Sequence, residues 1–529
     1  MRILYNGRIR TLNSNTPFAS ALAIQDGKIV AVGNDSEIQA IFKSGSSMEN
    51  LEGKVVWPGL TDAHIHLEYY ASVLDFVDCE TPTLQETLYR VAERAKVTPL
   101  GKWILGHGWN QNLWPEGFGN AHHLDSAAPN VPVFLTAKSW HAAWVNSITL
   151  NMAGITSETP DPEGGIIQRD SNRQPTGVLL ESAMALAQKM IPQPSVEEVS
   201  QKMLKAQSIL WQFGLTGIHD FDGSRCFSAL QNLQSSGQLK LRVIKSIPIA
   251  DMQNAIAIGL RSGFGNEHLR VGSIKCFSDG ALGPHTAAML EPYDGESSYT
   301  GELLMEEDEI FETGRNAVEH GFSLAIHAIG DRANRTVLNA YAKLREFEKS
   351  RGLPQFRHRI EHVQILNPHD FNRLAELGII ASVQPIHATS DMLMADRHWG
   401  KRCAWAYAFH TLAVNGTAMA FGSDAPVESP NPFLGLHAAV TRRRADGQPG
   451  LNGWYPEQRL TLDEALARFT VGPAYASCQE KNLGRLAPGH FADLILFNQD
   501  PFHLPPAEIL NVKPIATMIG GEWVWERRD

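Results

Sequence analysis

The stretch Pro58-Gly59-Leu60-Thr61-Asp62-Ala63-His64-Ile65-His66-Leu67 contains a histidine pair, and the other motifs of this chain are interpreted in relation to that pair. The apolar run Val55-Val56-Trp57 leads into it and is typical of a buried strand that turn residues end. His64 and His66 follow at the end of this strand, so both side chains point to the same side of an extended chain. Neutral imidazoles so placed suit a shared zinc, iron or nickel ion. A bare His-x-His is as often two ordinary histidines. The residues at the other strand ends must therefore decide between a metal site and this alternative.

Length and composition indicate a large globular protein. The 529 residues fit a barrel enzyme with an appendage, and 43% of them are hydrophobic. The net charge of −11 argues against a nucleic-acid surface, and Arg442-Arg443-Arg444 is expected to be a solvated helix face. The sequence lacks an apolar run of signal-peptide or membrane-spanning length, and its five cysteines are scattered. We expect a cytoplasmic protein with a small-molecule substrate and no nucleic-acid or membrane partner; a homodimer is compatible with the sequence.

Both ends of the chain consist of short strand patterns. Residues 1–56 alternate apolar runs with turn signals such as Asn6-Gly7 and Asp26-Gly27, and one helix is expected over 35–42. Residues 484–529 again read as short strands, with Gly520-Gly521 at a hairpin. A meander this short cannot bury its own face. We therefore predict one composite β-sandwich domain made of residues 1–56 and 484–529.

Residues 57–483 alternate apolar strand patterns with helical patterns. The helix expected over 195–213 opens with a capping box of Ser195 and Glu198, and Thr461 with Glu464 opens another. With the first strand, the predicted strands number eight, over 216–220, 241–247, 271–277, 322–328, 358–363, 379–384 and 418–422. This order predicts an α/β fold, a (β/α)8 TIM-like barrel whose functional residues lie at the carboxyl ends of the strands. Extra strand-like pieces within about 68–193 predict an insertion over the barrel mouth.

Polar residues of metal-binding type stand at the ends of five of these strands. Any one of them could be a satisfied core group or a helix cap. Six together, each at the end of a strand, favour a metal site. The six are His64 and His66, Lys275, His327, His362 and Asp424.

Several longer motifs resemble the amidohydrolase superfamily, and more narrowly its YtcJ-like branch, which includes N-substituted formamide deformylases. The first-strand stretch and the ordered Lys275, His327, His362 and Asp424 carry the superfamily resemblance. The branch resemblance rests on the stretches Asp279-Gly280-Ala281-Leu282-Gly283, His327-Ala328-Ile329-Gly330-Asp331, Arg359-Ile360-Glu361-His362 and Gly422-Ser423-Asp424-Ala425-Pro426-Val427. It covers essentially the whole chain and says little about the substrate.

The resemblance implies a site with two divalent metal ions, zinc by preference. It assigns His64 and His66 to one metal and His327 and His362 to the other. Carbamylated Lys275 would bridge the two metals, and Asp424 would bind the first metal and handle the proton. The chemistry agrees, because two cations can activate a hydroxide and polarise a carbonyl while a carboxylate shuttles the proton. The alternative for Lys275 is an ordinary amine turned towards a carboxylate such as Asp279.

Two departures from the branch bear on the substrate. Pro284-His285 stands where the branch commonly has an arginine, so His285 is a predicted substrate contact. Trp140-His141-Ala142 stands where family members tend to have Gly-His. Trp109 and His141, both in the insertion, are further predicted contacts, although tryptophans there are at least as often core.

The predicted activity is metal-dependent hydrolysis of an amide- or formamide-type carbon–nitrogen bond in a small molecule. The same centre would also serve hydrolysis of a cyclic amide, carbamate or ester. A noncatalytic binding or regulatory barrel is a third reading, which the complete ligand set and Asp424 disfavour.

Overall fold

The computed structural model describes residues 1–42, 45–111, 114–138 and 141–528. The chain forms two compact units, one made of Met1–Tyr70 and Ser200–Asp529 and the other of Ala71–Val199. Among the described residues, every helix is too short or too polar to cross a membrane.

The centre of the first unit is a sheet of eight parallel strands. A parallel bridge between Ile65 and Ala425 joins its two edges, so the sheet is a nearly closed barrel. The predicted fold class is therefore confirmed. In sheet order the strands are β8 (Leu60–Ile65), β15 (Leu215–Asp220), β16 (Arg242–Pro248), β17 (Leu269–Phe277), β18 (Leu324–Ala328), β19 (Arg359–His362), β20 (Ile380–Val383) and β21 (Met419–Phe421).

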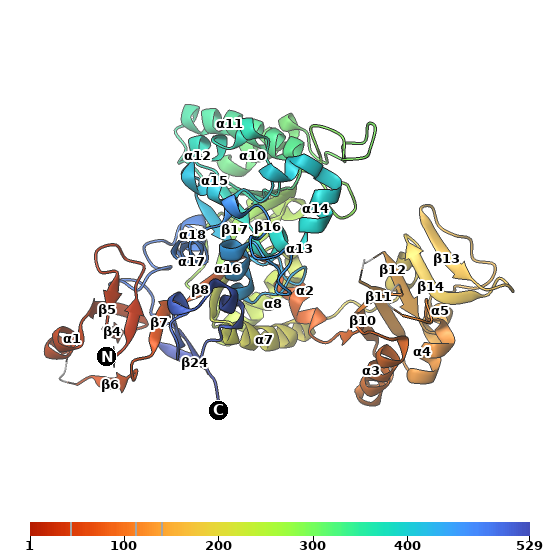
Figure 1. Ribbon diagram of the computed structural model, residues 1–529, viewed down its shortest axis with the longest axis horizontal. Helices are drawn as coiled ribbons and strands as arrows, with labels where there is room; N and C mark the ends of the chain where they lie inside the picture. Colours follow the sequence, from red (N-terminus) through yellow and green to blue (C-terminus); the bar gives the residue numbers. More distant parts are fainter. Residues whose placement is uncertain (43–44, 112–113, 139–140, 529) are drawn as a thin grey trace. The chain divides into compact units, whose positions relative to one another are not determined.

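Helices lie outside these strands, and Figure 1 shows two of them, α10 and α11, side by side. The capping box predicted at Thr461 and Glu464 is present at the start of its helix, and Ser195 and Glu198 exchange the predicted hydrogen bonds. The principal helices are α7 (Val196–Gln212), α8 (Ser224–Ser235), α9 (Met252–Ala257), α10 (Glu307–Glu319), α11 (Asp331–Ser350), α12 (Arg373–Leu377), α13 (Pro385–Ser390), α14 (Met392–Trp399), α15 (Phe409–Val414), α16 (Pro432–Thr441), α17 (Leu462–Arg468) and α18 (Val471–Ala476).

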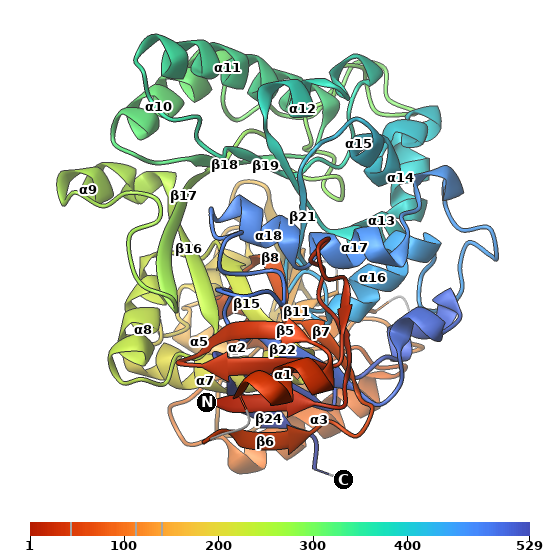
Figure 2. The same cartoon turned by 90° about the vertical axis from the view of Figure 1, so that its left-hand side faces the viewer.

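Strands from both ends of the chain form two further sheets of the first unit (Figure 2). Buried apolar side chains of the two sheets, among them Leu22, Val56 and Leu494, share one core, so the sheets pack as a sandwich. One sheet has the order β5 (Lys28–Gly33), β4 (Ala21–Gln25), β1 (Arg2–Tyr5) and β6 (Ser47–Asn50), with α1 (Asp35–Phe42) packed on it. The other has the order β24 (Glu522–Glu526), β23 (Ala516–Ile519), β22 (Leu494–Phe497), β7 (Val55–Pro58), β2 (Arg8–Arg10) and β3 (Phe18–Ala19).

The structure corrects the prediction that Val55-Val56-Trp57 leads directly into the histidine pair. That run is β7 and belongs to the sandwich, whereas His64 lies in a separate barrel strand, β8, and His66 directly follows that strand. The chain changes sheets at Gly59, where a Cβ atom would lie 2.3 Å from Thr216 Oγ1. Only glycine allows this close approach, so two strands adjacent in sequence serve different sheets.

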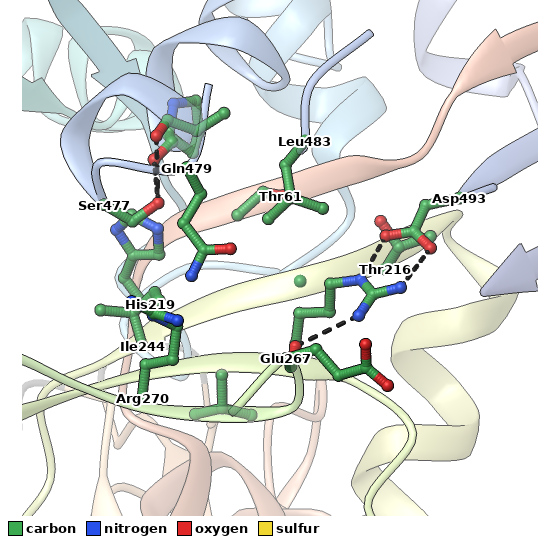
Figure 3. Close-up of a pocket in the computed structure, with 15 residues that line it drawn as sticks. Thr61, Thr216, His219, Ile244, Glu267, Arg270, Ser477, Gln479, Leu483 and Asp493 are labelled. Carbon is green, nitrogen blue, oxygen red and sulfur yellow. Dashed lines mark hydrogen bonds and ion pairs between the residues drawn. The ribbon is translucent and has the colours of Figure 1, made fainter. Parts of the chain in front are cut away.

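A buried ion pair joins the sandwich to the barrel. Arg242, the first residue of β16, donates to Asp493 through Nε at 2.5 Å and through a terminal nitrogen at 2.9 Å. Figure 3 shows Asp493 with Thr216 and Glu267 in a small pocket. Thr216 and Arg242 lie near the amino-terminal ends of their strands, so this pocket is at the barrel end opposite to His64. We therefore assign the pair a structural role.

The Arg442-Arg443-Arg444 run is not the solvated face that its charge suggests. Arg442 is 0% exposed and donates to the carbonyls of Trp454 and Tyr407 at 2.9 and 3.0 Å. Its guanidinium carbon lies 5.0 Å from the Trp454 ring centroid. Distant loop carbonyls and an aromatic ring thus solvate the charge in place of water.

The second unit has its own mixed sheet and its own core. Three tryptophans, Trp109, Trp114 and Trp144, pack there with ring centroids 5.9 to 6.5 Å apart. The sheet order is β13 (Gly165–Arg169), β14 (Pro175–Glu181), β12 (Ala142–Val145), β11 (Val133–Ala137), β10 (Ile104–Trp109) and β9 (Val77–Asp78). Its helices are α3 (Leu84–Val97), α4 (Ala121–Ala127), α5 (Ser147–Met152) and α6 (Met184–Gln188).

Candidate metal centre

The six predicted ligand residues line one cavity of about 320 Å³ in the first unit. Each stands at or near the carboxyl end of a barrel strand, where functional residues of such barrels gather. Their side chains are buried or, for His66, about a quarter exposed. The structure therefore brings together all six; their role as metal ligands stays a prediction. They are His64 and His66, Lys275, His327, His362 and Asp424.

Asp424 faces the two histidines of the first strand. Its Oδ1 lies 3.5 Å from His64 Nε2 and 3.4 Å from His66 Nε2. Each imidazole makes a hydrogen bond through its other nitrogen, from His64 Nδ1 to Glu361 at 2.6 Å and from His66 Nδ1 to Asp222 at 3.1 Å. With Nδ1–H donated to a carboxylate, Nε2 of each ring is the nitrogen that faces Asp424, the orientation found in metal-binding histidines.

His327 and His362 form the other half of the constellation, with ring centroids 4.5 Å apart. His362 Nδ1 lies 2.9 Å from Gln384 Oε1, so this ring also keeps its Nε2 lone pair. His327 has the opposite tautomer, because its Nε2 donates to the Gly280 carbonyl at 2.9 Å. The lone pair of His327 is therefore on Nδ1.

Lys275 lies between two aromatic rings at the floor of the cavity. Its Nζ is 4.9 Å from the Phe221 centroid and 4.8 Å from the Phe277 centroid, and the described residues offer it no hydrogen bond or ion pair. Asp279 instead accepts backbone N–H groups, from Ala288 among others. Burial chiefly lowers the pKa of Lys275 to about 8. A neutral amine, the form that reacts with carbon dioxide, is thus accessible near neutral pH.

A buried salt bridge between Arg359 and Glu361 helps to orient the site. Arg359 donates to Glu361 at 2.5 and 3.0 Å, and to the Ala63 carbonyl at 2.6 Å. Burial raises the pKa of Glu361, but the charge of Arg359 and the contact with His64 outweigh it and hold that pKa well below its ordinary value. Glu361 is therefore an anion that holds His64 in one tautomer.

Asp62 ties the first barrel strand to the last. It accepts N–H groups of His64 and Ser423, each at 3.0 Å, and the Ser423 hydroxyl at 2.5 Å. Asp424 follows with a left-handed φ of 61° and donates its N–H to the His64 carbonyl at 2.7 Å. Such strained backbone persists only where its surroundings hold it, and here it aims Asp424 at the histidines.

Sequence reasoning missed His387, on α13 directly after β20. Its Nε2 lies 4.0 Å from Asp424 Oδ2, and it lines the same cavity. The ligand atoms of His362, His387 and Asp424 lie within 4.8 Å of one another, as do those of His64, His66 and Asp424. Imidazole and carboxylate donors at this spacing fit divalent ions such as Zn²⁺. The stretch Gln384-Pro385-Ile386-His387 at a strand end was the signal available in the sequence.

The three predicted substrate contacts are placed differently. The His285 Nε2 lies 2.9 Å from His398 Nε2, while the preceding residues 281–283 line the cavity. Trp109 is 1% exposed and donates to the Leu135 carbonyl, so it is a core residue of the second unit and gains no support as a contact. His141 is half exposed, with Nδ1 2.9 Å from Glu181. Contacts of His285 and His141 with substrate stay predictions.

Comparisons with known proteins extend over nearly the whole chain. The model of the family described as "Amidohydrolase family" matches residues 48–525. The Bacillus subtilis (strain 168) protein named "Putative amidohydrolase YtcJ" is 32% identical over 536 residues, which cover 99% of this chain and 99% of that protein. N-substituted formamide deformylase of Arthrobacter pascens is 27% identical over 546 residues, which cover 99% and 98%. An uncharacterized metal-dependent hydrolase from Pyrococcus furiosus superposes with a TM-score of 0.80 at 28% identity, over 95% of this chain and 99% of that one.

Proposed function

The chain belongs to the amidohydrolase family, in its YtcJ-like branch, and on this premise we propose that it hydrolyses an amide- or formamide-type carbon–nitrogen bond of a small molecule. Membership of this family makes it a metal-dependent hydrolase. The type of bond that is cleaved, the identity of the metal ions and their number are what we propose here. The likeness to N-substituted formamide deformylase supports the choice of bond.

The observation that carries the proposal is the position of Asp424. One carboxylate faces the Nε2 atoms of His64 and His66 through Oδ1, while its Oδ2 lies 4.0 Å from His387 Nε2. A carboxylate so placed can bind a cation and still exchange a proton with a substrate. Neither of these roles is needed in a barrel that only binds.

The residues fit two divalent ions, with zinc as the proposed metal. His64, His66 and Asp424 would hold one, and His327 and His362 the other. Lys275, carbamylated by the addition of carbon dioxide with loss of one proton, would bridge them from the floor of the cavity. When bound, such ions acidify water and polarise a carbonyl oxygen.

The side chains of the chain then have defined tasks. Asp424 accepts the proton released as water adds to the carbonyl carbon and returns it to the leaving nitrogen as the carbon–nitrogen bond breaks. Glu361 and Asp222 hold His64 and His66 in their tautomers. Phe221 and Phe277 shield Lys275 from water, which favours its neutral form before it reacts.

We also propose a cytoplasmic location. All five cysteines are free, and four of them are buried, as expected of a protein that does not depend on disulfides.

The test is turnover by metal-free and metal-loaded protein of a panel of N-aryl formamides, acetanilides, cyclic amides and aryl esters. We expect the metal-loaded protein alone to release arylamine from formamides or anilides, and the Asp424→Asn variant to release almost none. Cleavage of the esters or cyclic amides alone would overturn the assignment of the bond. Equal turnover with and without metal would overturn the mechanism.

A further inference from the structure

His387 is a buried histidine whose ring nitrogens lack hydrogen-bond partners among the described residues. Its side chain is about nine-tenths buried, and within the described residues neither of its ring nitrogens has a hydrogen-bond partner. A buried imidazole normally pairs both nitrogens, because an unpaired buried polar group destabilises the folded protein. The cavity that it lines is therefore the place from which a partner would come.

The distance to Asp424 indicates where that partner would sit. Nε2 of His387 and Oδ2 of Asp424 are 4.0 Å apart, which is too far for a hydrogen bond between them. One atom placed about 2.8 Å from each could bond both. Oδ1 of the same carboxylate faces His64 and His66, so Oδ2 is the oxygen left to share a partner with His387.

We infer that His387 is a catalytic residue that hydrogen-bonds the leaving nitrogen of the substrate. This inference rests on the proposed function. Asp424 Oδ2 gives its proton to the lone pair of that nitrogen as the carbon–nitrogen bond breaks, and the N–H that the nitrogen already carries donates to His387 Nε2, so His387 itself neither gains nor loses a proton. The nitrogen departs as a neutral amine, and Asp424 ends as a carboxylate.

A competing role for His387 is that of a metal ligand, since its nitrogen lies within 4.8 Å of the ligand atoms of His362 and Asp424. The 4.0 Å gap to Asp424 and the full set of six other ligand side chains in the same cavity favour contact with substrate. The two roles differ in what happens to the metals, so metal content and the visible spectrum of the cobalt(II)-loaded protein separate them.

The main experiment compares wild type with His387→Ala on N-aryl formamides whose anilines span poor to good leaving groups. We expect kcat/KM to fall about 10- to 100-fold for the parent aniline, as for loss of a hydrogen bond to a charged group, and hardly at all for p-nitroaniline. The His387→Gln variant keeps an acceptor oxygen and should recover part of the loss. A loss equal for all leaving groups would overturn the inference.

Two measurements check that only the hydrogen bond has changed. Metal content and the cobalt spectrum without substrate should match wild type, and a change in either would assign His387 to the metals instead. The control is His437→Ala, which removes another buried imidazole, on α16, outside this cavity. It should leave the rates unchanged while showing a comparable effect on thermal stability.

The inference can be separated from the proposed function. If wild type cleaves none of the formamides or anilides, the proposed function fails, and phosphate then serves as a tetrahedral probe of the same side of Asp424. We expect His387→Ala to weaken phosphate binding to the cobalt-loaded protein at least tenfold. Equal phosphate affinities would overturn the inference.

Discussion

Nδ1 of His64 lies 2.6 Å from Oε2 of Glu361, and both side chains are almost completely buried. This contact determines which nitrogen of His64 faces the cavity. The positive charge of Arg359 stabilises the carboxylate of Glu361, so Glu361 stays ionised although water is excluded. This predicted ligand on β8 is thus oriented by Glu361 on β19, five positions away in the order of the barrel sheet.

Weakening this contact should weaken metal binding. Glu361→Gln keeps an acceptor oxygen but removes the charge, and it leaves Arg359 buried without its anion. We expect about 10- to 100-fold lower metal affinity, measured by competition with a chelator. Glu348→Gln is the matched control, because Glu348 is equally buried but pairs with His358, outside the cavity. Unchanged affinity in Glu361→Gln would show that His64 is not held for a metal.

Removal of a first-strand histidine should cost both metal and activity. His66→Ala deletes an imidazole whose Nε2 lies 3.4 Å from Asp424. We expect the protein to bind less than its full metal complement and to lose turnover, by elemental analysis and rate measurement. Full metal content with full turnover would refute the placement of the first metal.

The gathering of the six predicted ligand residues in one cavity could be predicted because each lies at or near the end of an apolar strand, and barrel topology brings such ends together. Two features could not be predicted, for physical reasons. The sheet change at Gly59 depends on the close approach of Thr216, which is 157 residues further along. Burial of Arg442 depends on carbonyls supplied by residues 407 and 454.

His387 escaped prediction for a related reason. It lies on a short helix after the seventh strand, and its importance arises from unpaired nitrogens and from the 4.0 Å distance to Asp424. Neither property is local in the sequence. The motif around it could suggest a site residue only once the strand order was known.

Asp424→Asn should separate binding from catalysis. The amide oxygen can still approach a metal, but the amide cannot accept a proton. We expect the fold and much of the metal to remain while turnover falls by about 10²–10⁴-fold or more, measured on wild-type and variant proteins of equal metal content. Rates near those of wild type would place the proton acceptor on another residue.

Lys275 should bind metal only after it has reacted with carbon dioxide. Reconstitution of metal-free protein should therefore depend on bicarbonate, and Lys275→Ala should lose at least one metal. Short carboxylic acids should partly rescue this variant, because a carboxylate can replace the carbamate bridge. Full activity with a single metal and an unmodified lysine, judged by mass spectrometry and metal analysis, would contradict the carbamate.

The central claim is that these six side chains hold two metal ions in one cavity. Anomalous diffraction at the zinc edge from crystals of metal-loaded protein tests it most directly. We predict one peak beside His64, His66 and Asp424, a second beside His327 and His362, and density between them continuous with Lys275. A single peak held by His362, His387 and Asp424 alone, with a bare amine on Lys275, would contradict the claim.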